Sequence, residues 1–237
     1  MSSLIAAKKL LMASASGTKA TYVNDYFSND LYTGTGTMSG SSDSGAKTIT
    51  NSIDYSEGAL TWIKQRSHAD SHQLYDTVRG DNKRIYSNSG DAENTANGDR
   101  WGLKFNSNGY TLGNAADGIN VDTRTYAGWT FRKQKGFFDV VTWTGNGSDP
   151  RNISHSLGSV PGCILYKRLD TTSDWVVYHC SLTNPATYML QLDGDIAEYG
   201  AHGDFGSTLP TASVFTVASN LNTSGATYVA YLFAGSN

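Results

Sequence analysis

The sequence contains one long internal repeat, which limits the folds that the chain can adopt. An aromatic-Thr-Gly-x-Gly segment occurs at residues 32–36 and again at residues 143–147. Five further blocks match in the same order, and the two copies of each lie 102 to 105 residues apart. The paired blocks are 48–53 with 152–157, 60–64 with 163–167, 74–76 with 177–179, 109–112 with 214–217, and 125–131 with 227–233. A period this long indicates two copies of a whole domain, because solenoids and propellers repeat every ~20–50 residues.

Within each copy, short segments rich in β-branched and aromatic residues alternate with turns containing Gly, Asn, Asp and Ser. About seven such strands per copy are typical of an all-β sandwich. We therefore predict an all-β fold with two tandem, homologous β-sandwich domains of jelly-roll-like type, residues 30–133 and 137–237. The junction between them is too short for a flexible tether, so the domains should lie side by side.

The composition argues against two classes of partner. Charged residues make up 16% of the 237 residues, and the net charge is −3. A nucleic-acid-binding chain would carry a basic surface, which this composition does not provide. No apolar run approaches the ~20 residues that a membrane span needs. We expect no nucleic-acid partner and no membrane span.

Residues 1–29 precede the first repeat, and we predict that they form an N-terminal arm containing one short α-helix. Leu4, Ile5, Leu11 and Met12 recur at helical spacing and form an apolar side. A helix this short is only marginally stable alone in water. Such a helix needs a surface to hold it: a second copy, another protein or the chain's own domains. We predict that these four residues anchor the chain to a partner.

The residues that could carry chemistry are few. His68 and His72 have the spacing of metal ligands on a helix, but they align with a hairpin turn, where that spacing loses its meaning. The Asp-Gly-Asp segment at 193–195 lacks the full ligand set of a calcium loop. His179 and Cys180 are neighbours on a predicted strand, so their side chains point to opposite faces. We expect no catalytic residues, no metal and no cofactor, and therefore a protein that is not an enzyme.

The two cysteines have a specific predicted placement. A hairpin centred near residues 170–174 would set Cys163 directly across from Cys180, where a disulfide is geometrically conceivable. Two cysteines in a chain of this length do not make a disulfide framework. We predict two buried free thiols.

The aromatic residues divide into two groups. Those at equivalent or near-equivalent positions of the two copies are predicted to lie in the core, with a glycan-binding platform as the alternative: Trp62, Tyr75, Trp129, Tyr166, Tyr178 and Tyr231. For Trp129 and Tyr231 the prediction is a core or interface position on the last strand of each copy. Others lie in or beside two polar excursions, 79–100 and 199–209, where recognition residues tend to sit on a rigid scaffold. The predicted surface recognition residues are Tyr86, Trp101, Tyr199 and Phe205.

Several blocks together resemble a known group of proteins. They include Leu-Thr-Trp-Ile-Lys-x-Arg from residue 60, Leu-Tyr-Asp-Thr-Val-Arg-Gly from residue 74 and Phe-Asn-Ser-Asn-Gly-Tyr-Thr-Leu-Gly from residue 105. Tyr-Thr-Gly-Thr-Gly, Trp-Val-Val-Tyr-His and Thr-Tyr-Val-Ala-Tyr-Leu-Phe-Ala complete the set. The combination resembles the tail-fibre-like virion structural proteins of tailed bacteriophages, of the marine and cyanobacterial type, over roughly residues 20–237.

The resemblance implies a non-enzymatic structural protein located in the phage particle. We expect a tail-fibre or tail-attached subunit, a homo-oligomer that could be a trimer, anchored by its N-terminal helix to other virion proteins and presenting β-domains for host attachment. Two alternatives stay open. The chain could be a capsid decoration protein held by the same arm, or a carbohydrate-binding module that recognises a host surface glycan.

Overall fold

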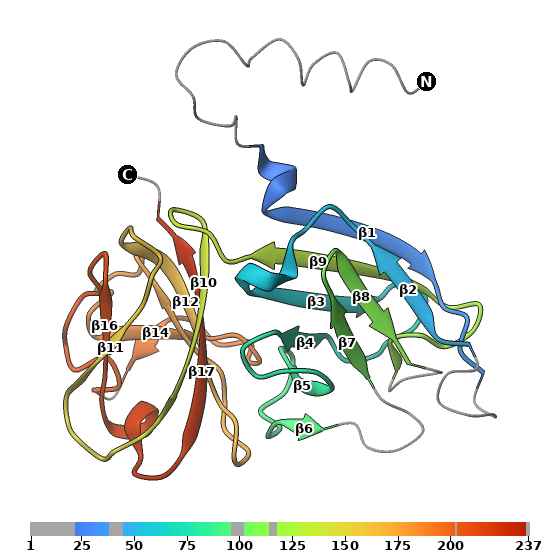
Figure 1. Cartoon of the computed structure of the whole chain (residues 1–237). Helices are drawn as coiled ribbons and strands as arrows, with labels where there is room; N and C mark the ends of the chain where they lie inside the picture. The colour runs from blue at the N-terminus through green and yellow to red at the C-terminus, as the bar shows by residue number, and fades with distance from the viewer. Residues whose placement is uncertain (1–21, 38–44, 96–101, 114–117, 202, 236–237) are drawn as a thin grey trace, which may run out of the picture.

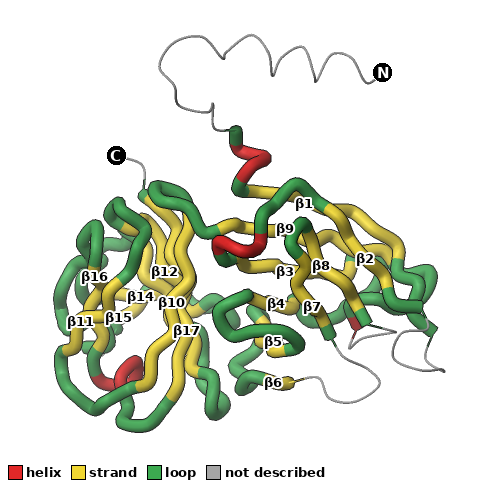
Figure 2. Tube along the Cα trace, viewed as in Figure 1, coloured by secondary structure: helices red, strands yellow, loops and turns green. Residues whose placement is uncertain are grey.

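The computed structural model describes residues 22–37, 45–95, 102–113, 118–201 and 203–235 (Figure 1). Strands dominate this part of the chain, and the named helices are short 3-10 turns: η1 (Val23–Asp25), η2 (Tyr55–Glu57) and η4 (Ser219–Asn222) (Figure 2). The prediction of an all-β fold is confirmed for these residues. The predicted helix and its anchor residues Leu4, Ile5, Leu11 and Met12 lie outside the described residues.

The first half contains two antiparallel sheets. The large sheet has six strands in the order β1-β9-β3-β4-β5-β6, and the small sheet has three in the order β2-β8-β7. The large-sheet strands are β1 (Phe27–Thr33), β3 (Ala59–Gln65), β4 (Gln73–Asp76), β5 (Lys83–Tyr86), β6 (Asn94–Thr95) and β9 (Thr125–Arg132). The small-sheet strands are β2 (Lys47–Thr50), β7 (Leu103–Asn106) and β8 (Gly109–Leu112).

The second half is built in the same way. Its large sheet has the order β10-β17-β12-β13-β14-β15, and β11 pairs with β16 in a small sheet. The large-sheet strands are β10 (Phe138–Thr144), β12 (Pro161–Arg168), β13 (Val176–His179), β14 (Tyr188–Gln191), β15 (Tyr199–Gly200) and β17 (Thr227–Ala234). The small-sheet strands are β11 (Arg151–Ser154) and β16 (Val214–Val217).

The two large sheets correspond strand by strand and in register. In both, the last strand lies between the first and the third strand of its half. Trp62 of β3 faces Trp129 of β9, and Leu165 of β12 faces Tyr231 of β17, which are pairs at the repeat offset. The shared order is what the internal repeat of the sequence predicts.

Each half has its own core between its large and small sheets. In the first half this core includes Ile63, Tyr75 and Tyr110. In the second half it includes Trp143 and Phe215. A stacked aromatic pair occurs at equivalent positions in both cores. Tyr32 stacks on Tyr126 with ring centroids 4.9 Å apart, and Trp143 stacks on Tyr228 at 5.1 Å.

A third core joins the halves, and we call it the seam. The outer faces of the two large sheets pack on each other, because Leu60, Leu74 and Ile85 of the first half cluster with buried side chains of the second. The second-half members include Phe138, Val140, Leu165, Trp175, Val177, Val229 and Tyr231. The molecule therefore has four sheet layers, and in Figure 1 the two halves lie side by side.

The predicted core aromatics are distributed over these three clusters. Tyr75, Tyr166, Tyr178 and Tyr231 are at most 3% exposed, which confirms the prediction for them. Trp62 and Trp129 are only half-buried. For Trp129 the core prediction is wrong, since it belongs to none of the three clusters.

The aromatic-Thr-Gly-x-Gly segments end the first strand of each half. An Asn holds each segment from the loop before the last strand: Asn120 accepts a hydrogen bond from the Thr35 amide, and Asn222 accepts one from the Asn146 amide. Both Asn side chains are buried, at 0% and 1% exposure. The repeated segment is therefore a structural element of each half.

The first glycine of each segment, Gly34 or Gly145, is required by a close backbone approach. A Cβ on Gly34 would lie 2.1 Å from the Val121 carbonyl oxygen, and one on Gly145 would lie 2.0 Å from that of Thr223. Contacts this short force the backbone to shift.

We expect Gly145→Ala to lower the free energy of unfolding by about 1–3 kcal/mol, the usual cost of overpacking. Urea denaturation of the variant and wild type measures the difference. Gly200→Ala is the matched control, because no atom lies within 4 Å of the added Cβ and the change should be nearly neutral. Equal stability of both variants would contradict this account of the segment.

Two boundaries differ from the predictions. β1 begins at Phe27, so residues 27–29, assigned above to the N-terminal arm, belong to the first large sheet. The Phe27 ring packs against Phe131 of β9 at 5.1 Å, which extends the strand to this point. The excursion from residue 79 onward is also not simply exposed, because β5 and β6 continue the sheet.

The β12–β13 hairpin forms as predicted but one residue out of register. Cys163 faces His179, and Cys180 lies beyond the paired residues. Both cysteines are free thiols, as predicted. Cys163 is half-buried and Cys180 is exposed, so the prediction that both are buried is wrong. His68 and His72 lie on the turn between β3 and β4, as the sequence indicated.

Candidate functional site

The seam is completed by the loop between β12 and β13, which reaches across to the first half. The Trp175 indole N–H donates to the Tyr86 carbonyl at 2.7 Å, and the Ser173 amide donates to the Gly90 carbonyl at 2.8 Å. In return the Glu93 amide donates to the Leu169 carbonyl at 2.8 Å. The halves therefore hold each other through backbone hydrogen bonds as well as apolar contacts.

Lys167 strengthens the same contact. Its Nζ donates to the carbonyl oxygens of Gly90, Ser173 and Arg168 at 2.8 to 3.1 Å, so all three ammonium protons have acceptors. Burial lowers the pKa of Lys167 to about 8, although nearby carboxylates act in the opposite direction. The equivalent Lys64 donates to the Asp70 carbonyl within its own hairpin loop.

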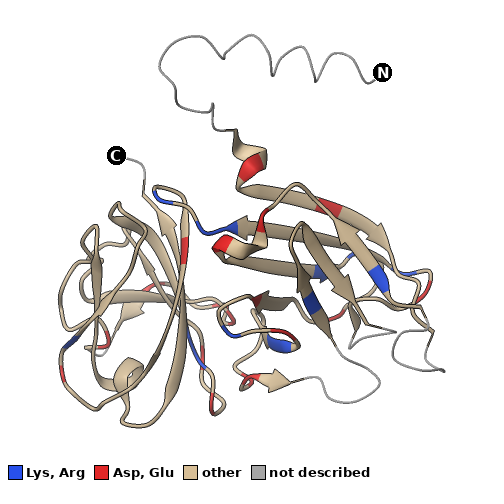
Figure 3. Cartoon of the chain, in the orientation of Figure 1, with Lys and Arg blue, Asp and Glu red and all other residues tan. Residues whose placement is uncertain are grey.

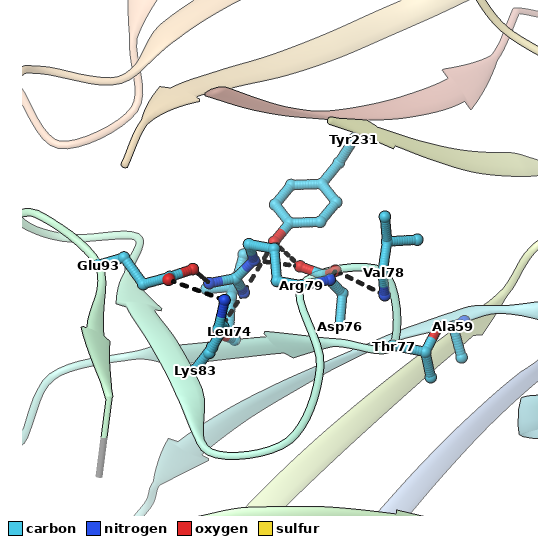
Figure 4. A network of polar contacts seen from close by, with 9 residues as sticks. All are labelled: Ala59, Leu74, Asp76, Thr77, Val78, Arg79, Lys83, Glu93 and Tyr231. Atoms are coloured by element: carbon cyan, nitrogen blue, oxygen red, sulfur yellow. Dashed lines mark hydrogen bonds and ion pairs between the residues drawn. The ribbon is translucent and has the colours of Figure 1, made fainter. Parts of the chain in front are cut away.

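A buried polar network lies next to this contact, where β4 ends against β17 (Figure 4). Asp76 accepts hydrogen bonds from the amides of Val78 and Arg79, from the Arg79 guanidinium, and from the Tyr231 hydroxyl at 2.7 Å. Arg79 also donates to the Leu74 carbonyl at 3.0 Å and to the Tyr231 hydroxyl at 3.2 Å. Tyr231 comes from the second half, so the network crosses the seam.

The charges in this network are stabilised by their neighbours. Burial alone lowers the pKa of Arg79, but Asp76, Tyr231 and Glu93 outweigh burial and raise it, so the guanidinium stays charged. Burial raises the pKa of Tyr231 well above its ordinary value, so the hydroxyl stays protonated. Every oxygen of Asp76 already accepts hydrogen bonds, which leaves no free acceptor for proton transfer. The buried part of the network is therefore structural.

An open cleft of about 460 Å3 lies over the network, and we call it the seam cleft. Both halves line it: Val78, Arg79, Lys83 and Glu93 from the first, and Thr142, Trp143, Thr144, Leu169, Thr227 and Tyr228 from the second. At the rim of the cleft the Lys83 Nζ lies 3.7 Å from the Glu93 Oε1. The Lys83 side chain is 43% exposed and the Glu93 side chain is 16% exposed. These groups can form hydrogen bonds with a ligand.

Charge does not single out another site in the described part of the chain. Figure 3 shows Lys, Arg, Asp and Glu scattered in small numbers over both halves, with no extended region of one sign among the described residues. The same residues contain no group of three or more His, Cys, Asp or Glu that could hold a metal ion. The seam cleft is therefore our candidate site.

Comparison with protein families places the chain. The family model described as a domain of unknown function, DUF7483, matches residues 23–237. The chain belongs to this family. No curated protein and no solved structure matches the chain.

The matched range contains both halves and both walls of the seam cleft, while residues 1–22 lie outside it. The family model therefore spans the two-half unit described here. In the described residues, no helix combines the length and the apolar character needed to cross a membrane.

Of the four predicted recognition residues, the three that the structure describes do not line the seam cleft. Phe205 is 2% exposed and packs against the rings of Tyr166 and Tyr178, so the prediction of a surface role is wrong for it. Tyr199 is half-buried and packs on the second-half core. Tyr86 is half-buried under the Arg84 guanidinium, and its carbonyl serves the seam. Trp101 lies outside the described residues.

The residues of the network were missed as site residues. Asp76 and Arg79 stand in the Leu-Tyr-Asp-Thr-Val-Arg-Gly block, and Tyr231 was assigned only to the core. The sequence held one weak signal. Asp76 of the first copy corresponds in the repeat to His179 of the second copy, so the acidic residue occurs only in the first copy. The pairing with Tyr231 could not be read from the chain, because it depends on how the halves pack.

Proposed function

We propose that this chain is a non-enzymatic structural protein of a bacteriophage virion, a tail-fibre or tail-attached subunit that presents its β-domains for host contact. The observation that carries the proposal is the seam: two β halves are joined by an apolar core and a buried polar network. Such a joint holds the two halves together, which suits a part that presents a surface. The sequence resemblance to tail-fibre-like proteins points the same way.

We also propose the finer description of the architecture. The halves are homologous β-sandwich domains, residues 27–133 and 137–237, and the matching strand orders and registers support this. Residues before the first strand form the anchor, with Leu4, Ile5, Leu11 and Met12 as its contact side, and they hold the chain in a homo-oligomer such as a trimer. Other virion proteins are the partners.

The place in the particle can be tested directly. Gold-labelled antibodies raised against the full chain are applied to purified virions of a phage whose genome encodes the chain, and the particles are imaged by electron microscopy. Label on the tail supports the proposal, and label over the capsid lattice identifies a decoration protein instead. If mass spectrometry of the purified particles does not find the chain, the virion proposal is wrong.

We expect deletion of residues 1–20 to abolish oligomerisation while leaving the thermal midpoint nearly unchanged. The reason is that the removed residues precede every strand of the two halves. Analytical ultracentrifugation measures the mass, and circular dichroism measures the melting. Lys8→Gln/Lys9→Gln is the control, since it keeps the apolar side of the arm. A truncated chain that still assembles would refute the anchoring role.

A further inference from the structure

The second-half wall of the seam cleft carries a row of hydroxyl groups. Thr144 of β10 and Thr227 of β17 are register partners, and Thr142 lies two residues before Thr144 on the same face. All three are exposed and line the cleft. The rings of Trp143 and Tyr228 stack in the second-half core, on the other face of the sheet. On this strand pair the side chains that face the cleft are therefore those of the threonines.

The charged groups at the first-half wall and directly beneath it balance. Arg79, Lys83 and Glu93 line the wall, and Asp76 is fully buried behind it. The closest pairs are Arg79 with Asp76, Arg79 with Glu93 at 3.1 Å, and Lys83 with Glu93 at 3.7 Å. A charged ligand would therefore find no uncompensated partner. The rim still offers hydrogen bonds, because an ammonium has three donors and a carboxylate has several acceptor positions.

We propose that the seam cleft binds an uncharged, hydroxyl-rich ligand, namely a saccharide. Its hydroxyls donate to Glu93 and accept from Lys83 on one side, and they exchange hydrogen bonds with the threonines on the other. Val78, 45% exposed at the cleft, offers an apolar surface for the C–H groups of a sugar ring. The volume of about 460 Å3 lies in the usual range for small-molecule sites, roughly 300–1,000 Å3.

This inference specifies the ligand for the host contact in the proposed function, and it rests on that function only for the source of the sugar. Binding itself is a property of the isolated chain and does not require the virion. A chain that labels the tail but binds no saccharide keeps the proposed function and refutes the inference. A chain that binds a saccharide but is absent from virions refutes the proposed function and keeps the inference.

The test is a titration of the full chain with free glucose, galactose, N-acetylglucosamine, rhamnose and lactose, with inorganic phosphate as a charged probe. Backbone amide chemical shifts report both the affinity and the location of binding. We expect at least one sugar to bind at millimolar concentration, with shifts concentrated at residues 78–93, 142–144 and 227–228. Phosphate should cause no saturable shifts there.

The first half supplies a matched control for the threonines. Thr33 and Thr125 are register partners at the equivalent positions of β1 and β9, and they do not line the cleft. We expect Thr144→Val/Thr227→Val to weaken sugar binding about tenfold through the loss of two hydrogen bonds, and Thr33→Val/Thr125→Val to leave it unchanged. The inference is overturned if no sugar in the panel binds, if phosphate binds the cleft instead, or if both double variants behave alike.

Discussion

Replacing Asp76 with alanine is expected to lower the free energy of unfolding by about 3–5 kcal/mol, the cost of leaving one partner of a buried ion pair without the other. Arg79 would keep its charge in a site where its side chain is only 2% exposed, with Glu93 as its remaining acid. Tyr231 would also lose the acceptor for its hydroxyl. Urea denaturation of the full chain measures the change.

Two further variants separate charge from hydrogen bonding. Tyr231→Phe removes the hydrogen bond to a charged acceptor and should cost about 1.5–3 kcal/mol. Asp76→Ala/Arg79→Met removes both charges and should be more stable than Asp76→Ala alone, because no uncompensated charge stays buried. If Asp76→Ala costs less than about 1 kcal/mol, an ordinary surface-like effect, the network does not stabilise the seam.

The second large effect is expected at Trp175, whose side chain is fully buried in the seam. Trp175→Ala should cost about 3–5 kcal/mol, as truncation of large buried aromatic residues does. The variant loses the stacking on Tyr231, at 6.3 Å between ring centroids, and the hydrogen bond to the Tyr86 carbonyl. Because the hydrogen bond to Tyr86 joins the halves, calorimetry should show either a lower midpoint or two separated transitions.

Trp129→Ala is the matched control, since this tryptophan lies on the equivalent sheet of the first half but is only half-buried. It should be clearly less destabilising than Trp175→Ala. Trp175→Phe should recover part of the loss by keeping a ring in the seam while lacking the indole N–H. Equal effects of the two alanine variants would show that the seam contributes no more than ordinary surface packing.

The strand content and the correspondence of the halves could be read from the sequence because both depend on local patterns. The Tyr32–Tyr126 and Trp143–Tyr228 stacks follow from aromatic residues at matching repeat positions. The hairpin register was predicted to within one residue. The exact register is set by the type and length of the turn, which the residue pattern of the two strands did not reveal.

The candidate site could be predicted only in small part. Phe205 lies in a loop rich in Gly and Asp, and loops of that composition are usually exposed. In this fold the loop folds inward, and the Phe205 ring fills the core beside Tyr166. The composition of a segment indicates its average exposure, whereas the burial of one side chain depends on which residues of other segments pack against it.

The sequence by itself determined that this protein is built from two matching β units. The strands, the turns and the close-packed glycines repeat in the sequence, and each of them depends on contacts within a single unit. The tertiary structure decided which faces meet. Both copies present an apolar outer face, but the choice of Asp76, Arg79 and Tyr231 as partners arises from residues more than 150 positions apart in the chain. The seam and its cleft are therefore products of packing between units, where no local pattern records the partner.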